Sequence, residues 1–277
     1  MSAQNLIDLE RYPIHDPVRR QEIVDDIRKS LRQDGCAVVR GFLTPEGVAA
    51  LCDEADRVAH LGFHNRSRTN AYFTKDDPSL PDDHPVRQFF DRSNAFVAAD
   101  HFPPDGPLRQ VHDAAGFDSF IQDCLEEKDF YRYADPLADV IVNTAGEGNG
   151  FPWHFDTNNF TVTLAIQNAE SGGEFEYAPN IRKDNENFSE VAKVLAGTSD
   201  KVVSLRLEPG DLQLFRGRYS LHRVAPLKGA TARHVAIFSY VDTPDMVGAP
   251  ERVKQLYGRV LPIHLERAGQ RRDALID

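Results

Sequence analysis

The second half of the chain is a succession of short β patterns separated by Gly/Pro turns, and this succession constrains the fold most. Only one helical pattern, over residues 188–195, interrupts it. Many short strands joined by such turns are typical of an antiparallel sandwich or barrel. We therefore expect an all-β core with flanking helices, a double-stranded β-helix (jelly roll, cupin-like). The expected strands cover residues 139–143, 160–167, 173–177, 201–207, 212–215, 221–225 and 233–241.

Helices are expected on either side of this core. Residues 17–33 repeat apolar side chains at helical spacing (Val18, Ile23, Ile27, Leu31), and a strand follows at 36–43. Thr44 and Pro45 provide the N-cap and first turn of a second helix that runs to about residue 60. A third helix is expected over 113–127, and a basic, peripheral one over 250–272. We predict a single domain over 1–277, with a helical N-terminal part (1–61), a lid-like insert (62–110), a jelly-roll core (about 135–245) and a C-terminal helix.

The insert over residues 62–110 shows no clear helical or strand period in its hydrophobic residues. It is rich in Asp, Pro, His, Asn and Arg, and a long irregular segment inside a compact domain is usually functional or disordered. Its aromatic residues argue for a folded segment that contacts a substrate. The candidate substrate residues are Arg68, Asn70 and Tyr72 in the insert, with Thr157 and Asn158 near the centre of the chain; Asn65, Arg66, Thr69, His64 and His101 are further polar candidates.

Charge and composition limit the partners. The net charge is −11, with 43 acidic and 32 basic residues, which argues against nucleic acid or an anionic membrane surface as a partner. No apolar run approaches the length of about 18 residues that a bilayer requires. The N-terminus does not resemble a secretory signal, and the three cysteines form no disulfide framework. A cytoplasmic protein with a small-molecule substrate is expected, and a homodimer remains open.

Two histidines and an aspartate are the candidate metal ligands. His154 and Asp156 are two residues apart, so in a strand they share a face while Phe155 points into the sheet. His222 follows the turn at 209–211 and must come from a distant strand. Two imidazoles and one carboxylate leave half of an octahedral metal open, which is typical of non-haem Fe(II) oxygenases. Unrelated polar residues, or a zinc hydrolase with the same ligands, are the alternatives.

Arg233 is the candidate anchor for an acidic cosubstrate. It shares a strand face with Val235, Ile237 and Ser239, which pairs one charge with an otherwise mostly apolar wall. A guanidinium matches a carboxylate with two parallel hydrogen bonds. Arg218 and Arg223 are rivals for this role, and a surface salt bridge is the structural alternative.

Taken together, His154-x-Asp156, the turn Pro209-Gly210-Asp211, His222 and Arg233 resemble the Fe(II)/2-oxoglutarate-dependent dioxygenases. The resemblance extends over most of the chain and is closest to the group of free-amino-acid hydroxylases and lysine halogenases. It implies Fe(II) on His154, Asp156 and His222, with 2-oxoglutarate and O2 as cosubstrates. It also implies that 2-oxoglutarate binds Arg233, with Thr163 or Asn143 adding a hydrogen bond.

The resemblance also bears on the reaction. Halogenases in this group have a small residue where Asp156 stands, which frees a metal site for chloride. The carboxylate therefore favours hydroxylation of an unactivated C–H bond, or desaturation, over halogenation. A free amino acid or a derivative is the expected substrate. Hydroxylation of a peptide or protein residue, and a non-catalytic metal-binding jelly roll, are the competing hypotheses.

Overall fold

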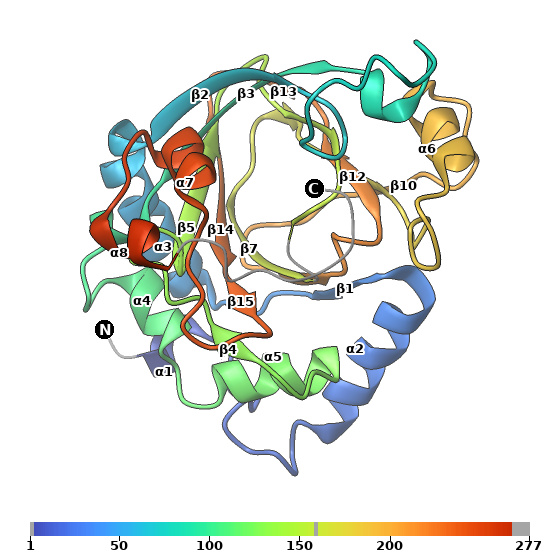
Figure 1. Cartoon of the computed structure of the whole chain (residues 1–277). Helices are drawn as coiled ribbons and strands as arrows, with labels where there is room; N and C mark the ends of the chain where they lie inside the picture. Colours follow the sequence, from blue (N-terminus) through green and yellow to red (C-terminus); the bar gives the residue numbers. More distant parts are fainter. Residues whose placement is uncertain (1–2, 158–159, 268–277) are drawn as a thin grey trace.

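Two antiparallel β-sheets face one another in the computed structural model, which describes residues 3–157 and 160–267 (Figure 1). The larger sheet has seven strands in the order β1-β11-β7-β14-β5-β3-β2, and the smaller has four in the order β10-β9-β12-β6. Two further pairs, β13-β8 and β15-β4, flank them. This is the predicted all-β core with flanking helices, so the double-stranded β-helix is confirmed.

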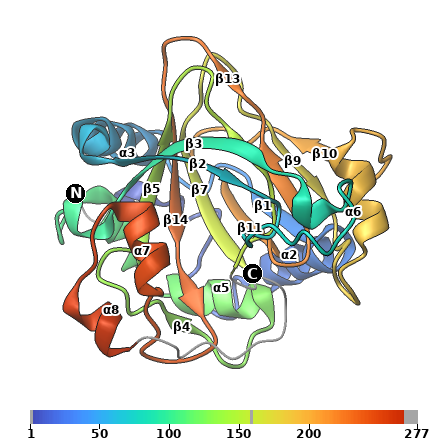
Figure 2. The ribbon, with the colours of Figure 1, turned by 45° about the horizontal axis from the view of Figure 1, so that its top comes forward.

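The order of the larger sheet can be followed in Figure 2. Its strands are β1 (Cys36–Val39), β2 (Phe63–Thr69), β3 (Phe90–Val97), β5 (Val140–Ala145), β7 (Thr161–Gln167), β11 (Leu212–Phe215) and β14 (Arg233–Phe238). The smaller sheet contains β6 (Phe151–His154), β9 (Phe175–Ala178), β10 (Val203–Leu205) and β12 (Leu221–Val224). The short pairs are β4 (Tyr131–Arg132), β8 (Ser171–Gly172), β13 (Leu227–Lys228) and β15 (Tyr240–Val241).

The larger sheet separates the main core from the space between the sheets. In β14, Ala236 and Phe238 pack into the core, whereas Val235 and Ile237 line a cavity between the sheets. This alternation follows from the two-residue period of a strand. The predicted face of Arg233, Val235, Ile237 and Ser239 is therefore on the cavity side.

Helices α2 to α5 contribute to the core on the other face of the larger sheet. The helices are α1 (Ala3–Leu6), α2 (Gln21–Asp34), α3 (Pro45–Val58), α4 (Pro107–His112), α5 (Phe117–Leu125), α6 (Phe188–Leu195), α7 (Pro250–Tyr257) and α8 (Pro262–Glu266), with 3-10 turns at Ala59–Leu61, Pro85–Arg87 and Ala99–His101. The predicted helix over 188–195 is confirmed residue for residue. Thr44 caps α3 as predicted, since its side chain accepts a hydrogen bond from the Gly47 amide.

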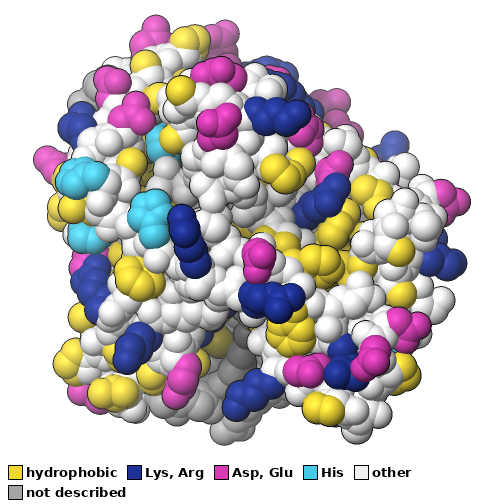
Figure 3. All heavy atoms as spheres, turned by 90° about the horizontal axis from the view of Figure 1, so that it is seen from above, with side chains coloured by type: hydrophobic (Ala, Val, Ile, Leu, Met, Phe, Trp, Pro, Cys, Tyr) yellow, Lys and Arg dark blue, Asp and Glu magenta, His cyan; other side chains and the backbone are white. Residues whose placement is uncertain are grey.

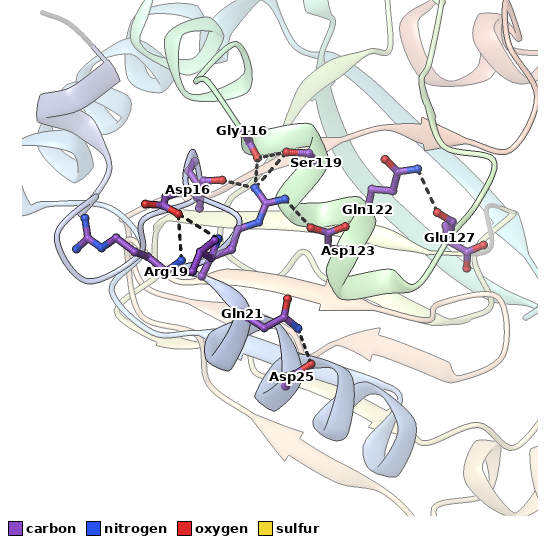
Figure 4. A network of polar contacts seen from close by, with 12 residues as sticks. Asp16, Arg19, Gln21, Asp25, Gly116, Ser119, Gln122, Asp123 and Glu127 are labelled. Carbon is purple, nitrogen blue, oxygen red and sulfur yellow. Dashed lines mark hydrogen bonds and ion pairs between the residues drawn. The ribbon is translucent and has the colours of Figure 1, made fainter.

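Two predicted helices are shorter than expected. The first begins at Gln21, so Val18 lies before it and is 85% exposed. Arg20 occupies the N-cap position instead, and its buried guanidinium donates to Ser119 and Asp123 of α5. Figure 4 shows this polar network between the start of α2 and α5. The third helix begins only at Phe117, because Gly116 precedes it with a φ of 87°.

The prediction of an irregular insert over 62–110 was wrong for two long segments. Residues of β2 and β3 pair antiparallel along their full length and extend the larger sheet beyond β5. Strand β2 lies at the edge of the sheet and exposes much of its surface, and β3, between β2 and β5, has a polar run over residues 91–94 in its first half, so neither strand shows an aliphatic run. Polar edge strands of this kind do not show the β-branched pattern by which strands are recognised.

The C-terminal helix is also not peripheral. It is divided into α7 and α8, and Arg252, Val253, Leu256 and Tyr257 of α7 contribute to the wall of the cavity. Gly258 ends α7 in the left-handed conformation. Residues 268–272 of the predicted helix lie outside the described residues. Within the described ranges, no helix is long and apolar enough to cross a bilayer.

Candidate metal centre and its cavity

The smaller sheet brings the two candidate histidine ligands face to face. Strands β6 and β12 pair antiparallel with His154 directly opposite His222, and their ring centroids lie 4.1 Å apart. The Asp156 Oδ1 atom lies 3.6 Å from His154 Nε2 and 3.4 Å from His222 Nε2. Candidate ligand atoms of all three residues fall within 4.8 Å of one another. The three residues that the sequence separates therefore form one cluster.

The backbone at Asp156 differs from the predicted strand. Strand β6 ends at His154, so the carboxylate is not part of a continuing strand. The next two residues are held by backbone hydrogen bonds, from the Phe155 amide to Ala71 O (2.8 Å) and from the Asp156 amide to Gly217 O (3.1 Å). Phe155 is buried in a separate cluster with Tyr72. The prediction that Phe155 points into the sheet from a continuing strand is therefore not met: its ring packs against Tyr72 and does not line the cavity.

Neighbouring groups orient each candidate ligand. The Nδ1 atoms of His154 and His222 lie 2.8 Å and 2.9 Å from the backbone carbonyls of Pro152 and Ser220. A proton on Nδ1 can bond these carbonyls, which leaves each Nε2 lone pair for a metal. The Thr161 hydroxyl donates to Asp156 Oδ2, so Oδ1 faces the imidazoles. Such outer contacts fix the geometry of metal sites.

The electrostatics of the cluster favour the metal-binding protonation states. Burial, together with the neighbouring His222, lowers the pKa of His154 to about 4. Burial alone would raise the pKa of Asp156, but His222 and His154 outweigh it and hold that pKa well below the usual range. At neutral pH the cluster therefore presents a neutral imidazole at His154 and a carboxylate at Asp156, the forms that bind metals.

The cluster lines a cavity of about 250 Å³ between the two sheets. Arg233 lines the same cavity, and it has no hydrogen bond or ion pair with any residue that the structure describes. Burial lowers its pKa to about 10. Thr163 and Asn143 also line the cavity: the Thr163 hydroxyl donates to Gln213 Oε1 (3.0 Å), and the Asn143 amide donates to Ala95 O (3.2 Å).

The two rival arginines have other contacts. Arg218 donates to the Thr157 carbonyl (2.7 Å) and does not line the cavity. Arg223 pairs with Glu176, and its guanidinium lies 4.8 Å from the ring centroid of Trp153. Of the three arginines that the sequence left open, only Arg233 faces the cavity.

Most of the predicted substrate residues lie elsewhere. Thr157 lines the cavity, whereas Asn158 is outside the described residues. Arg68 is on the exposed face of β2, where it pairs with Asp91 (3.5 Å). The buried Asn70 side chain shapes a turn by bonding Thr74 and Val86 O.

Tyr72 packs behind Phe155, with ring centroids 5.3 Å apart. The prediction that Arg68, Asn70 and Tyr72 contact the substrate is therefore not supported by their positions outside the cavity. They are polar or aromatic for reasons of turn geometry and packing. His64 and His101 do not line the cavity either.

The sequence reasoning missed Phe73, Arg92, Phe151 and Arg252 in the cavity wall. Arg92, Asn94 and Phe96 alternate along β3 and are all buried, so a strand period was available there. It was hidden because Arg92 follows Asp91 in a stretch that looks solvated. Arg252 stands four residues before Leu256 on α7, which is a helical repeat toward the cavity.

The outer surface shows no dominant basic region on the face drawn in Figure 3, where acidic and basic side chains are interspersed.

Solved structures with the same fold include an oxidoreductase of the 2OG-Fe(II) oxygenase family from Burkholderia pseudomallei, 13% identical, with a TM-score of 0.51 over 79% of this chain and 91% of that chain. HygX from Streptomyces hygroscopicus, solved with nickel and 2-oxoglutarate bound, is 12% identical, with a TM-score of 0.52 over 79% and 87%. A Trichoplax adhaerens prolyl hydroxylase, solved with a peptide fragment of hypoxia inducible factor, is 16% identical, with a TM-score of 0.54 over 81% and 91%.

A search of curated proteins found no significant match. A family model does match: that of Halogenase D (HalD), over residues 18–255. This range includes the three candidate ligands, Arg233 and both sheets. The chain therefore has the fold of the Fe(II)/2-oxoglutarate oxygenases and belongs to the Halogenase D family.

Proposed function

We propose that the protein is an Fe(II)/2-oxoglutarate-dependent oxygenase that hydroxylates an unactivated C–H bond of a small polar metabolite. One observation carries the proposal. His154, Asp156 and His222 form a facial set on the wall of a cavity that also contains an unpaired, buried arginine. A zinc hydrolase could use the same three ligands, but it has no need of Arg233.

The residues present fit the metal. Two imidazole nitrogens and one carboxylate oxygen suit Fe(II) and leave coordination positions open. His154 and His222 are turned toward Asp156 by their Nδ1 contacts, so no rearrangement of the rings is needed. The donors are largely buried, which limits competition from bulk water.

The residues present also fit 2-oxoglutarate. Arg233 offers a forked pair of donors to its far carboxylate, and the surrounding Val235, Phe175 and Phe215 suit its methylene groups. Thr163 and Asn143, the candidates for a further hydrogen bond to 2-oxoglutarate, line the same cavity, and the Thr163 hydroxyl bonds Gln213. In this proposal Arg233 binds the cosubstrate, and Thr163 and Asn143 shape its site.

When bound, iron with 2-oxoglutarate and O2 supplies an oxidant that replaces hydrogen by hydroxyl on carbon, with release of succinate and CO2. The protein positions the target carbon of the substrate and excludes competing reactions. Asp156, fixed by Thr161, keeps a negative charge beside the metal. Phe73 and Phe151 pack on His154 and cover one side of the site.

Hydroxylation fits Asp156 better than halogenation does, although the family takes its name from a halogenase. A halide would need the metal position that the Asp156 carboxylate faces. The structure builds around this carboxylate: Thr161 bonds one oxygen, and Gly217 leaves room for it where a Cβ atom would lie 1.8 Å from Oδ2. These two contacts accommodate a carboxylate at position 156, and a small side chain there would need neither of them.

The test is turnover in the presence of chloride. Protein loaded with Fe(II), 2-oxoglutarate and excess chloride is exposed to O2 with a panel of small acids and amino acids, and products are identified by mass. The proposal predicts succinate release coupled to a product that has gained one oxygen atom, and no turnover by the His222→Ala variant. A chlorinated main product would contradict hydroxylation, and succinate release only with peptides would transfer the proposal to a peptide hydroxylase.

A further inference from the structure

We propose that the substrate carries a group with two negative charges, either a phosphate ester or a pair of neighbouring carboxylates, and that Arg92 and Arg252 bind it. This inference rests on the proposed function, because it concerns the substrate of that same cavity. It narrows the sequence-based expectation of a free amino acid to an acidic metabolite.

Arg92 is a buried charge that has no ion pair with any residue the structure describes. It belongs to β3, is 2% exposed, and lines the cavity. Its Nε and Nη1 atoms have no hydrogen-bond partner. Its guanidinium carbon lies 4.0 Å from the ring centroid of Phe151 and 5.3 Å from that of Phe73. Buried polar groups are nearly always bonded, so an unpaired guanidinium at this place calls for a ligand that completes it.

Arg252 is a second guanidinium near the same ring. It belongs to α7, and its guanidinium carbon lies 4.7 Å from the centroid of Phe73. Its side chain donates to Gln255 Oε1 (2.8 Å) and has no ion pair with any described carboxylate. Burial lowers the pKa of Arg92, and the charge of the neighbouring Arg252 lowers it further. Two like charges that repel each other in this way are stabilised by an anion that contacts both.

The pair lies beside the candidate metal centre. The rings of Phe73 and Phe151 are 5.5 Å and 4.1 Å from the His154 ring, centroid to centroid. An anionic group on the arginines would therefore place the carbon atoms next to it near the metal. Binding energy from a charged group can position a reactive carbon in this way.

The charges of the cavity do not balance without such a group. Asp156 and the two carboxylates of 2-oxoglutarate offset a divalent metal and Arg233. Asp135 is the other carboxylate in the wall, and it accepts hydrogen bonds from the Leu137 and Gly248 amides and lies 3.0 Å from His264 Nε2. Asp135 is thus held by these contacts, and the guanidinium groups of Arg92 and Arg252 remain without an ion pair to any described carboxylate, so both can bind an anionic group of the substrate.

The same accounting argues against a cationic substrate side chain. Among the described residues of the cavity wall, the carboxylates are Asp135 and Asp156, and both are engaged. No carboxylate is left there to receive an ammonium group. A lysine-like substrate would bring a third positive charge to the two arginines, which costs free energy.

An open groove outside the cavity also has arginine side chains in its walls. Its walls include Arg66, Arg68 and Arg223, and it shares Arg92, Phe151 and Val224 with the cavity. Arg92 thus stands where the groove and the cavity meet. Arg68 pairs with Asp91 and Arg223 with Glu176, so the groove charges available to attract anions toward the site are those of Arg66 and Arg92.

The experiment measures small-anion binding to the loaded protein. The protein is saturated anaerobically with Fe(II) and 2-oxoglutarate, and the visible absorption band of their complex is recorded first. Methyl phosphate, malonate, acetate and methylammonium are then titrated by calorimetry. We expect methyl phosphate or malonate to bind at least about tenfold more tightly than acetate, with no binding of methylammonium. The stronger of the two dianions identifies the phosphate or the dicarboxylate class.

Variants tie this binding to the two arginines. Arg92→Gln and Arg252→Gln should each weaken dianion binding at least about tenfold, whereas Arg259→Gln, which changes an arginine paired with Asp100 outside the cavity and the groove, should not. Without ligand, Arg92→Gln should melt at least about 2 °C above the natural protein, because an unpaired buried charge is removed.

The outcomes separate the two proposals. Three results would overturn this inference: acetate or methylammonium binds as tightly as the dianions, dianion binding is unchanged in both variants, or Arg92→Gln melts at a lower temperature. If the absorption band of the iron and 2-oxoglutarate complex still forms, the proposed function stands in each of these cases. If the band never forms, the proposed function fails, and the inference fails with it.

Discussion

The Asp156 carboxylate is positioned by two residues that are not candidate ligands. Thr161 bonds Oδ2, and Gly217 lies so close to the carboxylate that any side chain at its position would displace it. The sequence identified Asp156 by its spacing from His154, but it contained no signal for either neighbour. Both contacts depend on where β6 ends and how the segment before β12 returns, and these are tertiary features.

Gly217→Ala tests the close approach. The added Cβ atom would lie 1.8 Å from Asp156 Oδ2, so the carboxylate must move away from the imidazoles. We expect the affinity for Fe(II), or for Mn(II) as a stable substitute, to fall at least about tenfold in a titration of the metal alone. Gly146→Ala is the matched control, because a Cβ atom there meets nothing within 4 Å. Equal metal affinity in both variants would refute this role of Gly217.

Thr161→Val tests the hydrogen bond. The change keeps the shape of the side chain but leaves Asp156 Oδ2 without its donor. Loss of an outer contact of this kind typically weakens metal binding about 10- to 100-fold. Thr163→Val is the control, since Thr163 is on the same strand and bonds Gln213 instead. If both valine variants bind the metal alike, Thr161 does not orient the carboxylate.

At the scale of the elements, the alternation of side chains along each strand determines which residues line the cavity. It also explains which of these residues could be predicted from the sequence. The period of two in β14 predicts that Arg233, Val235 and Ile237 share a face, and the structure has them in one wall of the cavity. The pairing of β6 with β12 could not be read from the sequence, because register depends on turns and neighbouring strands. The insert was predicted to be irregular because the edge strand β2 and the first half of its neighbour β3 carry polar residues that resemble a loop.

Arg233→Leu tests the role of this strand face. Leucine keeps the apolar contacts of the wall but removes the donors for a carboxylate. We expect the dissociation constant of 2-oxoglutarate to rise at least about 100-fold, corresponding to about 3 kcal/mol, with metal affinity nearly unchanged. Arg223→Leu should affect neither, because Arg223 pairs with Glu176 outside the cavity. Normal 2-oxoglutarate binding by Arg233→Leu would exclude Arg233 as the anchor.

At the scale of the whole molecule, the packing of helices against the larger sheet supports the site from behind. His112 of α4 is fully buried in this layer, with its ring centroid 5.3 Å from that of Phe238, and neither ring nitrogen has a hydrogen-bond partner. Burial, with a contribution from Arg132, lowers the pKa of His112 to about 4. The sequence showed a histidine without a partner but not its depth, which depends on how α4 and α5 pack on β14.

The low pKa predicts that the free energy of unfolding depends on pH. Between pH 6.5 and 4 the unfolded chain binds a proton at His112 that the folded protein does not, so stability is lost as the pH falls through this window. Urea unfolding at pH 7 and pH 4.5 should show that the natural protein loses about 2 kcal/mol more than His112→Leu. An equal loss in the two proteins would show that His112 is not responsible.

The central claim is that His154, Asp156 and His222 bind one metal ion and that Arg233 binds the keto acid on it. Anaerobic titration of Fe(II) and 2-oxoglutarate, followed by visible absorption, tests this claim most directly. We predict that a band appears and saturates at one equivalent of iron, and that it is absent from His154→Ala and His222→Ala under the same conditions. A band of equal strength in those variants, or none in the natural protein, would contradict the assignment of His154, Asp156 and His222 as the metal ligands.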